Sequence, residues 1–159
     1  MRTIDSPDEV LGRMLECLVI AFSYSVEAKR FVLVSDYPDK SPGSVRELIA
    51  LVFHDVDRFF REPGDLPALA RFHFSYFARD EVGGRVVQSV QSTDVAPGLR
   101  RARFWFGPNF GGVTLDYRSL AGLARGSRVV QKGREFVYSD VQTSLEFDFY
   151  NPFPDLLNP

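Results

Sequence analysis

Apolar residues, many of them aromatic, occupy every second position in several short segments of the chain. The alternating sets are Phe72, Phe74 and Tyr76; Phe104 and Phe106; Phe136 and Tyr138; and Leu145, Phe147 and Phe149. A period of two places all members of a set on one face of a β-strand. The chain has 15 phenylalanines in 159 residues, and aromatic side chains bury large areas when they pack together. The pattern therefore predicts a β-rich fold with an aromatic inner face.

Turn-forming residues divide the apolar segments into strands. The first two strands, at residues 17–26 and 31–35, are expected to form a hairpin around a turn at residues 27–30. Further strands are expected at residues 70–79, 85–92, 101–106, 113–117, 128–131, 135–139 and 145–150. The glycine-rich residues 107–112 lack the Gly-Lys-Ser/Thr ending of a phosphate-binding loop, so we interpret them as a hairpin turn. Residues 120–126 fit one or two helical turns.

The N-terminal segment carries the signals of a helix start. Ser6 is a capping residue, Pro7 takes the first helical position and Glu9 the third. The apolar residues that follow have helical spacing. These signals predict a short amphipathic helix over residues 7–16.

Residues 44–61 fit two different structures. Their apolar positions follow a helical stripe, and Ser44 with Glu47 matches a capping box. Residues 48–53, however, form a compact run rich in β-forming residues, which is typical of a buried strand. The local pattern favours the helix, and Pro63 lies just beyond the end of either element.

Length and composition indicate a single domain, spanning residues 1–159, of an ordinary globular class. No segment approaches the roughly 20 apolar residues that cross a bilayer, so we expect a cytosolic protein without a membrane partner. Cys17 is the only cysteine, which excludes an intramolecular disulfide.

Charge is distributed unevenly around a net value of −2, which does not support binding to nucleic acid. Residues 100–134 carry eight basic side chains and one acidic one, Asp116, whereas residues 135–159 carry five acidic side chains and no basic one. The basic block either faces an anionic partner or pairs with the acidic C-terminal strands. The partner contacts that we expect are Arg100, Arg101, Arg103 and Trp105.

Catalytic and metal-binding signals are weak. His54 and His73 are the only histidines, and no metal-binding spacing surrounds them. Cys17 has no catalytic signature around it, and a buried, inert thiol is the expected state. The carboxylates that could supply an acid–base pair are Asp116, Asp140, Glu146 and Asp148, but a solvent-facing strand surface is the default interpretation. We expect no metal, cofactor or catalytic residue.

Tyrosines in the strands allow a second interpretation. If the sheet curls, Tyr24, Tyr76 and Tyr138 would line a ligand pocket; otherwise they fill a core. At the C-terminus, the strings Asn151-Pro-Phe and Asp155-Leu-Leu match short peptide-recognition motifs. We expect instead that Phe153 and the leucines pack back on the sheet.

The order of a short helix, a hairpin over residues 17–35 and the segment 48–56 resembles small bacterial immunity-type proteins, which are single-domain, β-rich antitoxins and uncharacterised relatives. In that family the hairpin is followed by a strand with the pattern Leu-x-Phe-x-x-Val, which Leu51, Phe53 and Val56 match. The stretch from Tyr138 to Pro154 resembles their closing strand. The resemblance implies no catalytic residues, and it implies that residues 46–56 form a strand rather than a helix.

These observations predict an α+β fold that is mainly antiparallel β. We expect seven or more strands in a sandwich or a curved sheet, a short N-terminal helix and room for one further helix. The expected function is a non-catalytic bacterial binding protein, of immunity type, that acts on a protein partner by surface contact. The alternative is a small-ligand carrier with an aromatic-lined pocket, and an enzyme has the least support.

Overall fold

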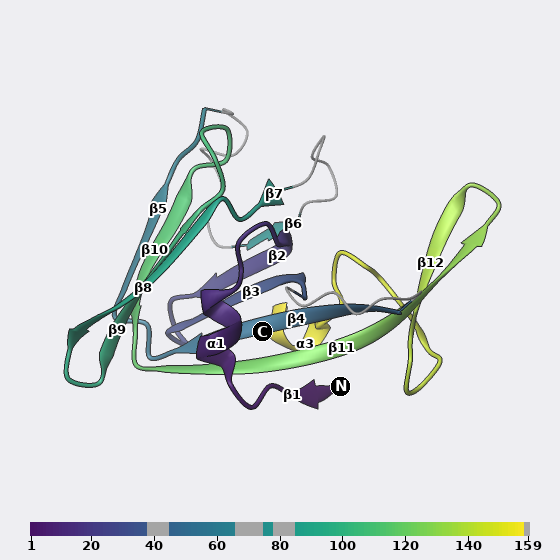
Figure 1. The fold of residues 1–159 in the computed structure, drawn as a ribbon, viewed down its shortest axis with the longest axis horizontal. Helices are drawn as coiled ribbons and strands as arrows, with labels where there is room; N and C mark the ends of the chain where they lie inside the picture. The colour runs from purple at the N-terminus through teal and green to yellow at the C-terminus, as the bar shows by residue number, and fades with distance from the viewer. Residues whose placement is uncertain (38–44, 66–74, 78–84, 158–159) are drawn as a thin grey trace.

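The chain folds into antiparallel β-structure with two short helices in the part that the structure describes (Figure 1). The structure is a computed structural model, and it describes residues 1–37, 45–65, 75–77 and 85–157. This architecture confirms the predicted α+β fold dominated by antiparallel sheet. Within the described residues, no helix is long and apolar enough to cross a membrane.

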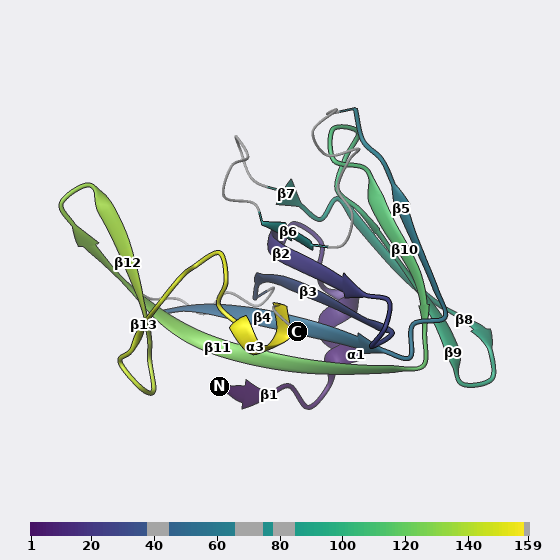
Figure 2. The same ribbon diagram turned by 180° about the vertical axis from the view of Figure 1, so that it is seen from behind.

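A large sheet forms the body of the molecule. Its described strands have the order β13-β12-β11-β4-β3-β2-β6, with β1 on β11 and β7 on β2. The strand bounds are β1 Arg2–Thr3, β2 Leu18–Ser25, β3 Arg30–Asp36, β4 Val45–His54, β6 Ser75–Phe77, β7 Arg85–Val86, β11 Ser119–Lys132, β12 Glu135–Asp140 and β13 Glu146–Phe147. At 14 residues, β11 is the longest strand, because it pairs first with β4 and then with β12. Beyond β4, the β11–β12 pair projects from the body as a two-stranded ribbon (Figures 1 and 2).

A smaller sheet stands at the opposite end of the molecule (Figure 1). It has the order β5-β10-β9-β8. Its strands are β5 Arg58–Glu62, β8 Ser89–Ala96, β9 Leu99–Trp105 and β10 Gly112–Tyr117. The three neighbouring pairs are antiparallel, which makes both β8–β9 and β9–β10 hairpins.

The two sheets meet at a corner formed by one pair of chain segments. His54 pairs with Ser119 in the large sheet, and Arg58 pairs with Asp116 in the small one. Between these pairs, the Asp57 amide donates to the carbonyl of Asp116 over 2.9 Å. Asp55 has a φ of 51°, in the left-handed region that allows a sharp bend. The same two segments therefore contribute to both sheets and hold the sheets at a fixed angle.

Aromatic rings fill the main core, between the two sheets. Phe53 on β4 packs edge-on against Phe104 and Tyr117 of the small sheet, at centroid distances of 6.1 and 4.9 Å, and tilts against Phe31 at 5.7 Å. Helix α1, Pro7–Gly12, adds Val10 and Leu11 to this core. Of the alternating phenylalanines that the structure describes, Phe104 and Phe106 face this core as their spacing predicts, whereas Phe136 is 62% exposed.

A second core covers the opposite face of the large sheet. Helix α3, Pro154–Leu157, and the tail before it place Phe153 and Leu157 over that face, where their side chains are 1% and 3% exposed. Strands β2, β3 and β4 are therefore buried on both faces. This burial explains their continuous apolar runs, which lack the simple alternation of a half-exposed strand.

Some element predictions fail at particular residues. Residues 45–61 form no helix: β4 and β5 are strands, as the family resemblance implies. Residues 120–126 belong to the continuous strand β11, because pairing with β4 overrides their helical spacing. The N-terminal helix ends at Gly12, and a turn follows in which Glu16 has a φ of 64°. Most of the predicted strand at 70–79 lies outside the described residues.

Candidate functional site

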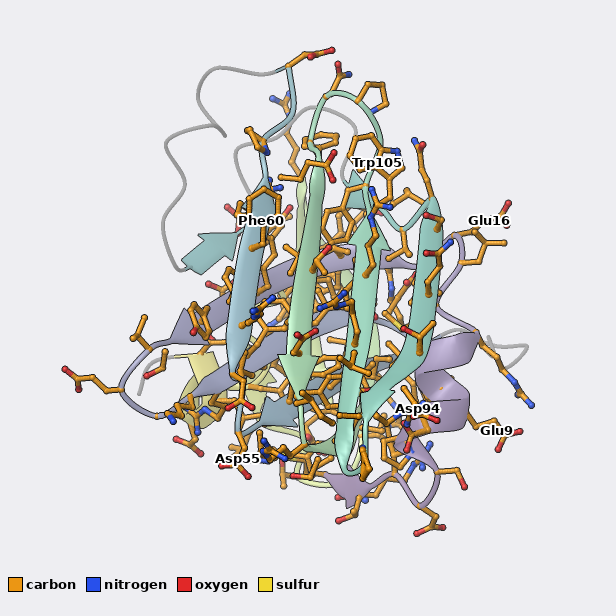
Figure 3. The ribbon with its side chains drawn as sticks, turned by 90° about the vertical axis from the view of Figure 1, so that its left-hand side faces the viewer. Glu9, Glu16, Asp55, Phe60, Asp94 and Trp105 are labelled. Carbon is orange, nitrogen blue, oxygen red and sulfur yellow. The ribbon has the colours of Figure 1, made fainter. Side chains whose placement is uncertain are left out.

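The small sheet has one face that packs on the core and one that faces away from it. Alternate residues such as Phe59, Phe104 and Leu115 belong to the main core. Strand register places their neighbours on the other side, which we call the outer face (Figure 3). The outer face consists of Arg58, Phe60, Glu62, Ser89, Gln91, Thr93, Arg101, Arg103, Trp105, Thr114 and Asp116.

Arg101 and Asp116 form a two-point ion pair on the outer face, in the row of residues nearest the corner between the sheets. Arg101 donates from Nε to Oδ1 over 2.7 Å and from Nη2 to Oδ2 over 2.9 Å. The guanidinium of Arg101, aided by the charge of Arg58, lowers the pKa of the Asp116 carboxyl despite its burial. Asp116 is therefore a charged, covered acceptor that holds Arg101 in one orientation.

Phe60 is the most exposed aromatic side chain of the outer face, at 62%. It follows the inward-facing Phe59, so β5 directs one ring to the core and the next to solvent. Arg103 lies two strands away in the same row, because both residues are paired with Thr114. Arg103 donates from Nη2 to Glu62 over 3.4 Å, an ion pair that solvent reaches.

Trp105 lies across a glycine on the neighbouring strand. Its partner in the register is Gly112, and a Cβ atom at Gly112 would come within 3.1 Å of Cε3 of the indole. The half-buried ring thus covers the space that the missing side chain leaves. Figure 3 shows Trp105 and Phe60 on strands either side of β10.

The outer face therefore combines two aromatic rings, ordered guanidinium groups and neutral polar side chains on a sheet. Aromatic residues and arginine are enriched where proteins bind one another.

Arg100 does not belong to the outer face, although its three expected neighbours Arg101, Arg103 and Trp105 are on the same strand. It pairs with Asp94 across the strands, forms an ion pair with Asp8 in the first turn of α1, and donates from Nη2 to Ser92 Oγ over 2.9 Å. Neighbouring residues in a strand point to opposite sides, so Arg100 lies on the other side of the small sheet from Arg101. There it links α1 to the small sheet through Asp8.

The expected tyrosine pocket is not assembled from the tyrosines that the structure describes. Tyr24 stacks on Phe59 at a centroid distance of 4.1 Å, against the main core. Tyr138 stacks on Phe149 at 4.5 Å, on the face of the large sheet that carries the second core. The two rings therefore lie on opposite faces of one sheet. Tyr76 pairs with Phe22 through β6, and its side chain is outside the described part.

The fold separates Asp116 from the other three candidate carboxylates. Asp116 binds Arg101 in the small sheet, whereas Asp140 binds Arg125 at 2.7 Å and Glu146 binds Lys132 at 2.9 Å in the large one. The basic block thus pairs with the acidic C-terminal segment only in part. Its other ion pairs reach acidic residues elsewhere, as Arg118 does to Asp57 and Arg103 to Glu62.

The remaining candidates from the sequence are Cys17, the two histidines and the glycine-rich turn. Cys17 is 2% exposed in the main core. His54 is exposed at the end of β4, and His73 lies outside the described residues. Among the residues that the structure describes, no three histidine, cysteine or carboxylate side chains come together to hold a metal ion. Residues 107–111 form the β9–β10 turn, as predicted, with the Gly111 amide donating to the Gly107 carbonyl over 2.8 Å.

The sequence pattern does not single out Phe60, because the helical stripe over residues 44–61 includes it. The signal was the doublet of Phe59 and Phe60: in a strand, adjacent aromatics must face opposite sides.

Comparison of the chain with models of protein families, with curated proteins and with solved structures finds no match in any of the three.

Proposed function

We propose that this chain is a non-catalytic binding protein that recognises another protein through the outer face of its small sheet. The observation that carries the proposal is the exposed Phe60, which shares one face of the small sheet with Arg101, Arg103 and Trp105. An aromatic ring that is 62% exposed costs hydration free energy, and a partner surface would recover it.

The arginines add selectivity to this apolar contact. Arg101 is held by Asp116, and Arg103 remains 52% exposed beside Glu62. A guanidinium that is already oriented loses little conformational freedom when it binds a carboxylate. We therefore propose a partner surface with an apolar pocket bordered by acidic groups. The resemblance to immunity-type proteins would make that partner a bacterial toxin, neutralised by contact.

Surface binding has more support than ligand carriage. The rings that a carrier would turn toward its ligand contact one another instead: Phe22 stacks on Phe106 at 6.5 Å, and Phe53 meets Tyr117 at 4.9 Å. These four side chains are at most 2% exposed.

The test is binding to the purified products of the genes that flank this one, measured by titration calorimetry. If the outer face is the binding surface, Trp105→Ala and Phe60→Ser each raise the dissociation constant by about 30-fold or more, as expected for central aromatic contacts. Phe136→Ser is the matched control, because Phe136 is also 62% exposed but lies on β12, far from this face. Equal binding by all three variants would overturn the proposal.

A further inference from the structure

The β11–β12 ribbon extends beyond the large sheet as a separate arm (Figures 1 and 2). We define the arm as residues 128–137, where the last β4 pair is Arg128 with Val45 and the turn contains Gly133 at a φ of 66°. An isolated two-stranded ribbon is only marginally stable in water. We therefore expect another surface to pack against the arm and stabilise it.

Both faces of the arm expose apolar side chains. Phe136 is 62% exposed and Val129 is 36% exposed on one face, and Val130 is 52% exposed on the other. A ribbon that remains in solvent would keep at least one face polar. Exposure on two faces is instead typical of a segment that a partner surrounds.

The Phe136 face continues into an aromatic cluster at the base of the arm. Tyr138 lies on this face and stacks on Phe149 at a centroid distance of 4.5 Å, with Phe147 at 6.4 Å. These three rings are half-buried. The surface thus contains a projecting ring, Phe136, next to a cluster of half-buried rings.

Charge favours a second copy of this chain as the occupant. The arm carries three basic side chains and one acidic one, whereas the chain as a whole has a net charge of −2. The rest of the molecule is therefore acidic, and residues 138–159 beside the arm carry four acidic groups and no basic one. Lys132 of the arm already binds Glu146 of this segment at 2.9 Å within one chain.

We propose that two copies of this chain form a two-fold dimer by exchanging arms. Phe136 of each copy packs against the aromatic cluster of the other, and the basic tip near Arg134 faces the other copy's acidic C-terminal segment. Such a contact is self-complementary, as a two-fold interface requires. It leaves the outer face of the small sheet, at the other end of the molecule, free for its own partner.

Sedimentation equilibrium of the purified full chain between about 1 and 200 µM tests the dimer. The wild-type protein is expected to sediment at twice its 18.0 kDa mass. Phe136→Ser is expected to raise the dimer dissociation constant by about 30-fold or more. Phe60→Ser, which removes an equally exposed ring from the other end, is expected to leave the dimer intact.

A second variant tests the charge contribution without altering the apolar faces. Arg134→Glu is expected to weaken the dimer by about tenfold at 50 mM salt and by less at 500 mM, because salt screens exposed charges. A wild-type protein that stays monomeric at 200 µM overturns the proposal. So does a dimer that Phe136→Ser and Arg134→Glu both leave unchanged while circular dichroism shows them folded. The Phe60→Ser variant distinguishes the dimer from the proposed binding function. If it loses partner binding but still forms the dimer, the two surfaces act independently.

Discussion

Arg125 on β11 binds Asp140 on the neighbouring strand β12, and the pair anchors the C-terminal segment. Nε of Arg125 donates to Oδ2 of Asp140 over 2.7 Å, and Nη1 donates to the carbonyl of Pro152 over 2.6 Å. The guanidinium also lies 4.0 Å from the ring centroid of Phe147. With side chains only 14% and 6% exposed, both charges depend on each other for their stabilisation.

Removal of Arg125 is expected to destabilise the fold strongly. Arg125→Ala leaves Asp140 buried without its cation, and such changes cost about 3–5 kcal/mol. Lys132→Ala removes an ion pair to Glu146 whose side chains are 61% and 63% exposed, and it is expected to cost less than about 1 kcal/mol. Urea unfolding followed by circular dichroism measures both. If the two variants lost similar free energies of unfolding, the buried Arg125 pair would stabilise the fold no more than the exposed Lys132 pair does.

Acid is expected to weaken the fold through Asp140. Burial by itself raises the pKa of this carboxyl, but hydrogen bonds from the amides of Thr143 and Gln142 and from Arg125 outweigh that effect and lower the pKa to about 2. In the unfolded chain an aspartate titrates near 3.9. The contribution of the Asp140 charge is therefore complete above about pH 4 and is lost as pH falls through about 2.

The comparison with Asp140→Asn isolates this effect. Above about pH 4 the wild-type protein is expected to exceed the variant in free energy of unfolding by on the order of 2 kcal/mol, and the difference should shrink between about pH 4 and pH 2. Thermal unfolding across this range, with Glu146→Gln as an exposed control, provides the measurement. A difference that stays constant with pH would contradict a lowered pKa.

Two glycines with similar backbone angles are expected to respond differently to substitution. Gly98 and Gly111 have φ values of 70° and 73°. A Cβ atom at Gly98 would meet nothing within 4 Å, whereas at Gly111 it would lie 2.0 Å from the carbonyl oxygen of Glu62. Gly98→Ala is expected to cost about 1–2 kcal/mol, from the left-handed backbone alone.

Gly111→Ala is expected to cost several kcal/mol more, because the backbone of β5 would have to move away from the β9–β10 turn. The free energies of unfolding of the two alanine variants, measured in urea, give the comparison. If the two losses were equal, the close approach of the turn to β5 would have no energetic weight.

Local patterns alone predicted the strands whose neighbours are close in sequence. The hairpin of β2 and β3, and the turn between β9 and β10, follow from alternation and glycine placement. The patterns failed where distant segments pair: residues 120–126 have helical spacing, yet β4 holds them in β11. Hydrogen bonds to a strand some 70 residues away outweigh a propensity of a few tenths of a kcal/mol per residue.

The candidate site shows the same division. The sequence alone indicated an arginine cluster beside Trp105, but only strand register could separate Arg100 from Arg101 and bring Phe60 to the same face. Alternation states that neighbouring side chains oppose each other, not which side meets the core.

The sequence by itself determined that this protein is a β-rich fold with an aromatic interior, because a period of two and a high phenylalanine content are local properties of the chain. The tertiary structure alone decided which surfaces remain exposed. Burial depends on what packs against each face: the small sheet covers one side of the large sheet, and the C-terminal segment covers the other. The outer face and the arm are the surfaces left outside those contacts. A local sequence pattern does not indicate which surfaces stay exposed.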